Sequence, residues 1–171
     1  VSKSESPDAL KWGRHVHRLD SATSGLVIIA KTLEAHRKFG DLFSSRQIKK
    51  CYHAIVQGRP QNQLISTEVD GKTAESKLSV ISSVQSLRNE FISLVLLEPS
   101  TGRTHQLRKH CAEIHHPIVG DQLYGENGNV MKHKGLFLAA TALEFNHPLT
   151  NEAVNISVPI PAKFEALLKR E

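Results

Sequence analysis

The chain contains only two cysteines, Cys51 and Cys111, and they do not form a CxxC pair. This excludes a small secreted scaffold held together by disulfides. No apolar run approaches the ~18 residues that a membrane-spanning helix requires, and the longest candidate covers residues 26–30. The amino terminus also lacks the basic and then apolar pattern of a secretion signal. We therefore expect a protein of a reducing, cytoplasmic compartment.

The sequence also lacks internal repeats, low-complexity tracts and any linker rich in proline and glycine. Of its 171 residues, 39% are hydrophobic and 23% are charged. These values are close to the average of globular proteins, which excludes a disordered or fibrous protein. We expect one domain over residues 1–171 with a sizeable core, and we expect the polar residues 1–13 to be poorly ordered.

The net charge is moderately positive, with 22 Lys and Arg against 17 Asp and Glu, a formal charge of +5 and a pI near 9.3. Such a balance favours a polyanionic partner. Residues 31–59 hold seven cations and two anions, which equals the whole excess. The cations are Lys31, Arg37, Lys38, Arg46, Lys49, Lys50 and Arg59. Taken alone, this run is explained more simply as a solvated helix face.

Hydrophobic periodicity predicts many strands and few helices. The continuous apolar run 26–30 predicts a strand buried on both faces, and Thr32 can cap a helix that continues to about Ser45. Further strands are predicted at 51–57, 78–84, 91–97, 136–145 and 153–158, with a turn at 85–89, a basic helix at 104–114 and a closing helix after Pro161. Their hairpin-like connections predict an α+β fold, a mostly antiparallel mixed sheet with flanking helices.

Two segments combine residues that could carry chemistry. Residues 17–26 read HRLDSATSGL and place Asp20 in a hydroxyl-rich loop before the predicted strand, where catalytic groups are often held. In QIKKCYHA, Tyr52 could stack on a nucleobase while the two preceding lysines bind phosphate. Each has a simpler explanation when taken alone, namely an Asx turn at Asp20 and a core tyrosine with snorkelling lysines.

A third segment, GRTHQLRKH, holds Arg103 and Arg108 five residues apart. At this spacing the two side chains project from different parts of a helix and its entry loop. One could bind phosphate while the other lies beside a carboxylate. The simpler explanation is a basic surface helix.

The histidines around these segments do not favour a metal site. His105 and His110 are not at the i, i+4 spacing of HExxH, no glutamate holds the general-base position, and neither cysteine pairs with another. A P-loop is excluded as well, because Ser24 and Gly25 are followed by leucine and not by lysine.

Taken together and in order, these segments resemble the signatures of the RluA family of RNA pseudouridine synthases. HRLDSATSGL is similar to the family's HRLD-x-x-TSGL string, KKCYHAIVQG to its second motif and TGRTHQLRKH to its basic third motif. HHPIVGDQLYG and LEFNHPLTNE match two further blocks, so the resemblance extends from about His15 to the final helix. RQIKKCYHAIVQG and LRKHCAEIHHPIVGD are most similar to the branch that contains tRNA pseudouridine synthase C. Five motifs in order outweigh the separate simpler explanations.

The resemblance implies that a uridine in tRNA or rRNA is flipped out of its stack and isomerised to pseudouridine, without a metal or an organic cofactor. It implies that Asp20 is the catalytic aspartate, that Tyr52 packs against the target base and that Arg108 pairs with the aspartate. We expect a monomer that binds RNA. The residues expected to contact RNA are Arg18, Lys49, Lys50, Arg103, His105 and Gln106.

The sequence departs from the family pattern in two places. No strand with a lysine-proline segment precedes the HRLD string, and Ala139 stands where the family usually has histidine. Residues 1–171 also contain no segment that resembles the S4-like RNA-binding domain of some family members. An alternative function is therefore a catalytically inactive RNA-binding module or RNA chaperone with the synthase fold. A zinc hydrolase that uses the histidines is a more distant alternative.

Overall fold

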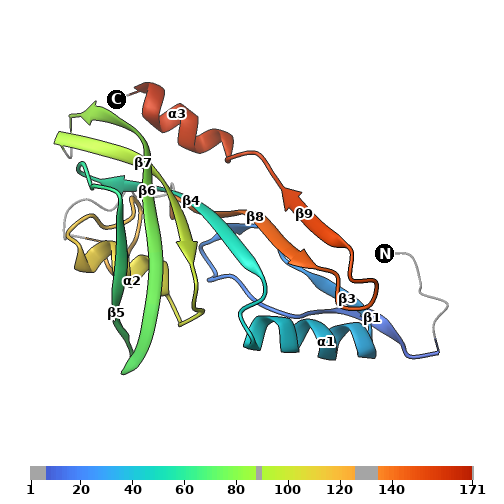
Figure 1. The fold of residues 1–171 in the computed structure, drawn as a ribbon. Coiled ribbons are helices and arrows are strands. Elements are labelled where there is room, and N and C mark those ends of the chain that lie inside the picture. Colours follow the sequence, from blue (N-terminus) through green and yellow to red (C-terminus); the bar gives the residue numbers. More distant parts are fainter. Residues whose placement is uncertain (1–6, 88–89, 126–134, 171) are drawn as a thin grey trace.

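The computed structural model describes residues 7–87, 90–125 and 135–170. Within these ranges the chain forms two sheets and three helices (Figure 1). The elements are β1 (Ala9–His15), β2 (Ser24–Gly25), β3 (Ile29–Thr32), α1 (Leu33–Ser44), β4 (Lys49–Gln57), β5 (Gln63–Val69), β6 (Lys72–Ser86), β7 (Glu90–Pro99), α2 (Gln106–Glu113), β8 (Leu138–Asn146), β9 (Ala153–Ser157) and α3 (Ala162–Arg170).

Seven strands form one sheet in the order β2-β8-β4-β7-β6-β5, and β9 pairs with β8 on the side that β2 also occupies. Among the described pairs of this sheet, only β2 and β8 run parallel. The predicted α+β class with a mostly antiparallel sheet is thus confirmed. β4 lies in the interior of the sheet, and its Tyr52 is opposite Leu97 of β7 and Ala140 of β8.

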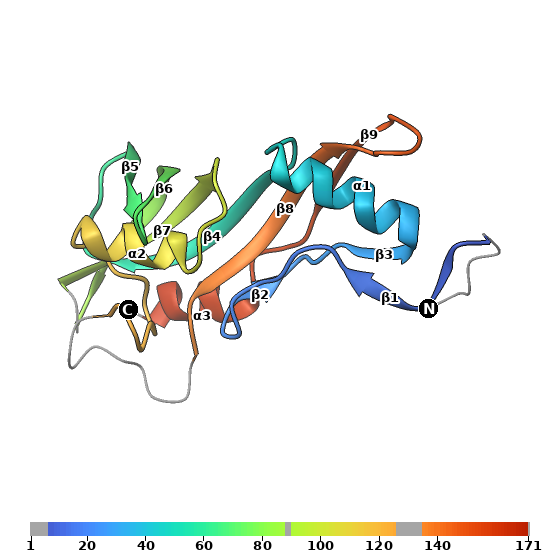
Figure 2. The same ribbon diagram turned by 90° about the horizontal axis from the view of Figure 1, so that it is seen from below.

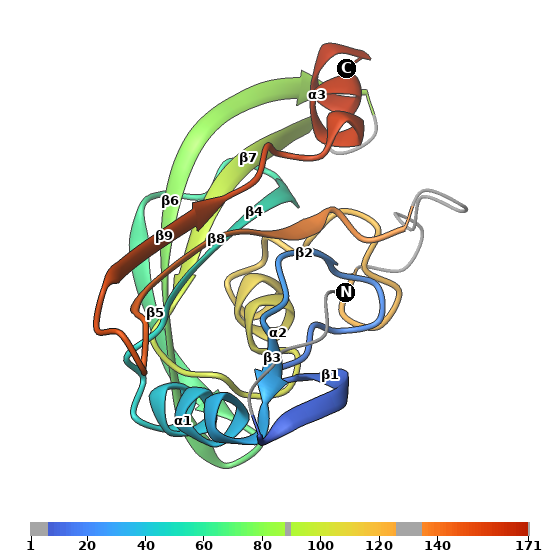
Figure 3. The same cartoon turned by 90° about the vertical axis from the view of Figure 1, so that its right-hand side faces the viewer.

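The larger apolar core lies between the sheet and helices α2 and α3. Figure 3 shows the sheet curving around α2, with α3 at one end of it. Leu107 and Cys111 of α2 and Phe164 and Leu167 of α3 are buried in this core with side chains of β4, β6 and β7. Burying each large apolar side chain contributes about 1.5–3 kcal/mol, so these contacts hold both helices against the sheet.

A second, smaller core lies between α1, the end of β8 and the residues Val16, Leu26 and Ile28, which flank the strands of the two-stranded β1–β3 sheet. Figure 2 shows α1 beside this sheet and the end of β8. Phe39 of α1 packs edge-on against Phe145, with ring centroids 5.4 Å apart. The helix begins as predicted, because the Thr32 hydroxyl accepts a hydrogen bond from the Ala35 amide at 3.1 Å. That bond satisfies one of the otherwise unpaired amides of the first turn.

The structure differs from the predictions near the amino terminus. The strand predicted at 26–30 and buried on both faces is wrong: β2 ends at Gly25, β3 begins at Ile29, and Ile29 is 57% exposed. A two-stranded sheet that packs α1 on one face leaves its other face uncovered, so a continuous apolar run does not guarantee burial. Residues 9–13, expected to be poorly ordered, belong to β1, which pairs with β3; residues 1–6 of that prediction lie outside the described residues.

Most of the other elements agree with the sequence patterns to within a few residues, but no strand is predicted at β5, and β6 begins at Lys72, well before the strand predicted at 78–84. β6 and β7 pair along ten positions, including the two strands predicted there, although residues 88–89 of the predicted turn lie outside the described ranges. The helix predicted at 104–114 begins at Gln106 and ends at Glu113. No helix in the described part of the chain is long and apolar enough to cross a membrane.

Candidate active site

A cavity of about 260 Å³ opens between the two apolar cores. Three segments distant in sequence enclose most of it: the loop 17–23, the start of β4, and the loop 99–107, which is counted here with the last residue of β7 and the first two residues of α2. Its lining residues are His17, Arg18, Leu19, Asp20, Thr23, Phe43, Lys50, Tyr52, Pro99, Thr101, Gly102, Arg103, His105, Gln106, Leu107 and Leu138. The three motifs singled out in the sequence therefore meet at one place.

The loop that carries Asp20 is anchored to the sheet by the short strand β2. The Thr23 amide donates to the Asp20 carbonyl at 2.8 Å and closes a turn, and the Leu26 amide donates to the Ala140 carbonyl at 3.0 Å. Gly25 has a φ of +121°, and a Cβ at this position would overlap the Ala140 backbone. Only glycine permits this close approach, which explains the glycine that ends the TSG string.

The carboxylate of Asp20 faces two basic side chains. Its Oδ2 lies 3.8 Å from Nη1 of Arg108, and its Oδ1 lies 3.9 Å from Nε2 of His105. Both distances exceed those of hydrogen bonds, so the side chain, 28% exposed to solvent, is near positive charge without being tightly bound to it.

Arg108 has a closer partner than the resemblance implied. Its Nε and Nη2 each donate to the Asp121 carboxylate at 2.7 Å, and Nη1 is the group directed toward Asp20. The bond to Asp121 raises the pKa of Arg108, although burial opposes the shift. Burial disfavours the Asp121 anion, but the bonds from Arg108 and from the amides of Tyr124 and Leu123 outweigh it and lower the pKa of Asp121. Arg108 is thus shared between two aspartates.

Tyr52 presents its ring to the cavity from the centre of the sheet. Burial, with a smaller effect of the Asp20 charge, raises the pKa of Tyr52 to about 12. The phenol is therefore neutral at physiological pH. A neutral, half-buried aromatic ring is suited to pack against a flat, uncharged base.

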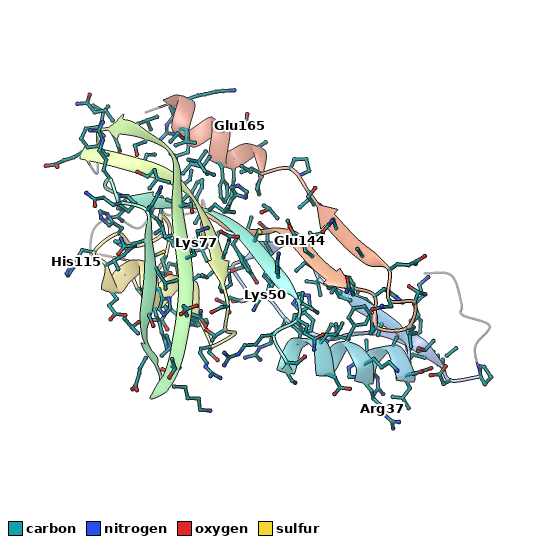
Figure 4. The ribbon with its side chains drawn as sticks, in the orientation of Figure 1. Arg37, Lys50, Lys77, His115, Glu144 and Glu165 are labelled. Atoms are coloured by element: carbon teal, nitrogen blue, oxygen red, sulfur yellow. The ribbon has the colours of Figure 1, made fainter. Side chains whose placement is uncertain are left out.

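The two lysines before Tyr52 point in opposite directions because side chains alternate along a strand. Lys50 lines the cavity and donates from Nζ to the Thr101 carbonyl at 3.1 Å. Its pKa is lowered by burial and by the charge of Arg46. Figure 4 shows Lys50 near the middle of the molecule, where β4 runs toward α1. Lys49 does not line the cavity and is 3.5 Å from Glu144.

Gln106, expected to contact RNA, forms four hydrogen bonds within the protein through its side chain. Its amide group donates to the Glu75 carbonyl and the Ser76 hydroxyl, and its carbonyl accepts from the Thr101 hydroxyl and the Arg103 amide. All its hydrogen-bonding capacity is used. The side chain thereby shapes the loop 99–107, and this is its place in the site.

The remaining residues predicted to contact RNA line the cavity. Arg18 is exposed beside Asp20, and Arg103 donates from Nε to the Thr73 carbonyl at 3.3 Å. His105 adopts a left-handed backbone conformation, with a φ of 55°, at the start of α2. Its Nδ1 lies 3.0 Å from the Tyr124 hydroxyl. Such a conformation is strained for a residue other than glycine and is frequent at functional sites.

The basic stretch 31–59 does not form one surface. Lys50 lines the cavity, whereas Arg59 follows the far end of β4 and stacks on the Phe91 ring at 3.5 Å. Arg37 is exposed on α1 (Figure 4). Counting charges along the sequence could not show that these cations lie at different places, because Lys50 and Arg59 are near opposite ends of the extended strand β4.

Three residues of the site had no role assigned from the sequence: His17, Asp121 and Tyr124. The His17 ring stacks on Phe43, with centroids 4.6 Å apart, and its Nε2 accepts a hydrogen bond from the Ile28 amide at 3.0 Å. Burial, with the charges of Lys50 and His15, lowers its pKa. The signals were present, because His17 begins the HRLD string and the other two lie in GDQLYG.

Comparisons with known proteins identify relatives over nearly the whole chain. The model of the RNA pseudouridylate synthase family matches residues 3–113. A tRNA pseudouridine synthase C of Yersinia pestis is 33% identical over 190 residues, covering 92% of this chain and 74% of the relative. A ribosomal large subunit pseudouridine synthase C of Pasteurella multocida is 34% identical over 185 residues, covering 95% of this chain and 55% of the relative.

Among solved structures, human RNA pseudouridylate synthase domain containing 1 superposes with a TM-score of 0.77 and 30% identity, covering 88% of this chain and 70% of that chain. The chain spans about half the length of several curated relatives that it matches. The family model matches most of the chain, and the chain covers nearly three quarters of the Yersinia pestis relative. These two findings confirm the resemblance found in the motifs. The chain belongs to the RNA pseudouridylate synthase family, and within it to the RluA family.

Proposed function

We propose that this protein isomerises uridine in RNA to pseudouridine and that Asp20 is the catalytic residue. The observation that carries the proposal is the cavity itself, in which the Asp20 carboxylate lies beside Arg108 and shares a wall with the Tyr52 ring. The residues come from three motifs far apart in the sequence. The names of the relatives support tRNA or ribosomal RNA as the substrate class.

The reaction exchanges one bond of uridine for another. The bond between C1′ of the ribose and N1 of uracil breaks, the base rotates, and a bond forms between C1′ and C5. The proton on C5 leaves, and N1 gains a proton. Atoms and electrons therefore balance within the nucleotide and water, and no redox partner is required.

A carboxylate can serve this reaction in two ways. Asp20 can attack C1′ as a nucleophile, or it can remove a proton from C2′ as a base. Both require a charged carboxylate in a partly closed cavity, where loss of water disfavours charge. Nη1 of Arg108, 3.8 Å away, supplies the compensating positive charge and leaves the carboxylate oxygens unbonded.

The remaining residues of the cavity would hold the target nucleotide. A uridine must leave its stack to reach Asp20, which costs a few kcal/mol. The ring of Tyr52 would recover part of that cost by packing on the uracil and would keep the base in place while it is detached. Arg18, which is exposed and lines the cavity beside Asp20, would occupy the space that the base vacates.

The cations around the cavity would bind the RNA backbone. Lys50 and Arg103 both line it, one from β4 and the other from the loop 99–107. Contacts of lysine and arginine with phosphate position RNA without reading its sequence. The choice of uridine would then depend on the shape of the RNA around it.

Release of tritium tests the function directly. Unmodified tRNA and large-subunit ribosomal RNA, transcribed with [5-³H]uridine, release tritium to water whenever a C1′–C5 bond forms. We expect release with the wild-type protein and none with Asp20→Asn, while RNA affinity changes little because phosphate contacts dominate it.

Asp70→Asn is the matched control, because it is the same substitution at an exposed turn position that does not line the cavity and contacts only the surface amine of Lys109 among the ion pairs of the described residues. It should release tritium at the wild-type rate. If Asp20→Asn also releases tritium at that rate, Asp20 is not catalytic. If the wild-type protein binds both RNAs without releasing tritium from either, the chain is an RNA-binding module and not an isomerase.

A further inference from the structure

Asp121 is the most completely bonded carboxylate near the cavity. Its side chain is fully buried, and it accepts four hydrogen bonds. Nε and Nη2 of Arg108 donate to it at 2.7 Å each, and the amides of Leu123 and Tyr124 donate to Oδ1 at 2.9 and 3.0 Å. Two of these donors belong to the backbone of its own turn, so the carboxylate cannot move without breaking that turn.

This arrangement fixes which part of Arg108 reaches Asp20. A guanidinium presents its donors as a rigid planar fork, and a bidentate carboxylate sets the orientation of the whole plane. The Nε–Nη2 edge is occupied by Asp121, so only Nη1 faces Asp20, at 3.8 Å. Arg108 therefore gives Asp20 a nearby positive charge but no two-pronged hydrogen bond.

The distinction matters for a carboxylate that must attack or deprotonate. Charge-assisted hydrogen bonds from an arginine fork stabilise a carboxylate strongly, and lone pairs engaged in them are less able to react. Without Asp121, the fork of Arg108 would be free to turn and bind Asp20 in this way. A buried arginine without a partner is strongly destabilising, so pairing with Asp20 would be favoured.

The second basic neighbour of Asp20 depends on Asp121 as well. The turn that Asp121 closes carries Tyr124, whose hydroxyl lies 3.0 Å from Nδ1 of His105. Nε2 of the same histidine lies 3.9 Å from Oδ1 of Asp20. The Tyr124 ring also packs against the Arg108 guanidinium, 5.1 Å from centroid to Cζ.

We propose that Asp121 is a positioning residue for the isomerisation: it holds Arg108 by one edge and His105 through Tyr124, so that both lie beside Asp20 without binding it. This inference rests on the function proposed above and deepens it. Asp121 does not touch the substrate. Its main effect on the reaction passes through Arg108, which it bonds directly; the route to His105 runs through Tyr124 and has the smaller effect.

The test is a double-mutant cycle in single-turnover reactions with saturating protein on the tritiated RNAs. Asp121→Asn keeps the volume of the side chain and removes the charge. We expect its chemical rate to fall by about 10- to 100-fold, the scale of a small misplacement at a reacting centre, while RNA affinity stays within about twofold. Asp70→Asn, which removes a carboxylate from Lys109 at the protein surface, is the control and should keep the wild-type rate.

The cycle separates positioning from a general loss of structure. If Asp121 acts through Arg108, the double variant Arg108→Lys, Asp121→Asn should be no more than about twofold slower than Arg108→Lys alone. Losses that multiply would overturn the proposal, and so would a wild-type rate in Asp121→Asn. Asp121→Glu, which keeps the charge, covers the case in which the asparagine variant does not fold. Its longer side chain displaces Arg108, so it should also be slow, and a wild-type rate would count against the proposal.

A readout without RNA keeps this inference separate from the proposed function. In ¹H–¹⁵N spectra of the protein, the Arg108 Nε–H should give a slowly exchanging signal that is absent in Arg108→Lys and loses its protection in Asp121→Asn. Rapid exchange in the wild-type protein would refute the positioning of Arg108 even if isomerisation occurs. If the wild-type protein releases no tritium, the proposed function fails, and the exchange data still decide whether Asp121 holds Arg108.

Discussion

Lys50 and Thr101 lie 51 positions apart in sequence, and the Nζ of the lysine donates a hydrogen bond to the threonine carbonyl at 3.1 Å. This bond ties β4 to the loop 99–107, so two of the three motifs are fixed relative to each other. At this position the pKa of Lys50 is lowered, because burial and the charge of Arg46 both disfavour the ammonium. A charged side chain held in this way retains two further donors for an RNA phosphate.

We expect Lys50→Met to weaken RNA binding by about tenfold, the effect of losing one charge-assisted contact of ~1.5 kcal/mol. The dependence of affinity on salt should become shallower by about one ion. Lys49→Met is the matched control, since Lys49 is the neighbouring lysine on the opposite face of β4 and is paired with Glu144. Filter binding over a salt series measures both effects. An affinity of Lys50→Met equal to that of the wild type would show that this lysine does not bind the RNA backbone, and equal losses for the two variants would show that the cavity face of β4 has no special role in binding.

Tyr52 provides a second comparison of two variants at one position. Tyr52→Phe keeps the aromatic face and removes a hydroxyl that is neutral at physiological pH, since the pKa of Tyr52 is raised to about 12. It should bind RNA nearly as the wild type does. Tyr52→Ala loses a base contact worth ~1–3 kcal/mol. The measurements are affinity and single-turnover tritium release, and identical values for both variants would exclude stacking.

Local features of the fold could be predicted from the sequence because short-range physics determines them. Thr32 caps α1 through a contact three residues away, and the two runs 78–84 and 91–97, separated by a polar stretch, predicted the antiparallel pair that β6 and β7 form. The apolar run 26–30 was assigned wrongly because its burial depends on what covers each face of a two-stranded sheet. No pattern within the run contains that information.

In the site, too, local features could be predicted from the sequence and tertiary contacts could not. The motifs predicted Asp20, Tyr52 and Arg108, because each motif carries its own residue. In the structure Asp20 and Tyr52 line one cavity, and Nη1 of Arg108 lies 3.8 Å from the Asp20 carboxylate. Alternation along β4 implies that Lys49 and Lys50 face opposite ways, but only the folded sheet determines which of them faces the cavity. The bond between Arg108 and Asp121 joins a helix to a later turn, and a single sequence does not indicate such a tertiary contact.

His110 should make the stability of the protein depend on pH. It is buried at the back of α2 with Nδ1 3.0 Å from the Ser76 hydroxyl, and burial lowers its pKa although Glu113 opposes the shift. The unfolded chain therefore binds a proton more readily than the folded one. The contribution of neutral His110 to the free energy of unfolding is fully present above the unfolded pKa of about 6.5. It is lost as the pH falls from that value through the lower pKa of the folded protein.

Denaturant unfolding at pH 7 and pH 5 checks this expectation. The free energy of unfolding of His110→Gln should fall less between the two pH values than that of the wild type, whatever the cost of the substitution at pH 7. His115→Asn is the control, because His115 is exposed after α2 (Figure 4) and asparagine tolerates its left-handed backbone. The free energy of unfolding of His115→Asn should fall between the two pH values as much as that of the wild type. An unchanged pH dependence in His110→Gln would remove this histidine as the cause.

Two glycines should respond to alanine in opposite directions. Gly25 has a positive φ and lies against the Ala140 backbone, so Gly25→Ala should lower the free energy of unfolding by more than ~1 kcal/mol. It should also slow isomerisation, since β2 anchors the Asp20 loop. Gly40 is in the interior of α1 with no atom within 4 Å of an added Cβ. Gly40→Ala should stabilise the protein by ~0.5–1 kcal/mol, because alanine reduces the freedom of the unfolded chain and favours helix. Urea unfolding measures both free energies. Tolerance of Gly25→Ala with full activity would contradict the packing of β2 on β8 as the support of the Asp20 loop, and destabilisation by Gly40→Ala would contradict the open space beside Gly40 of α1.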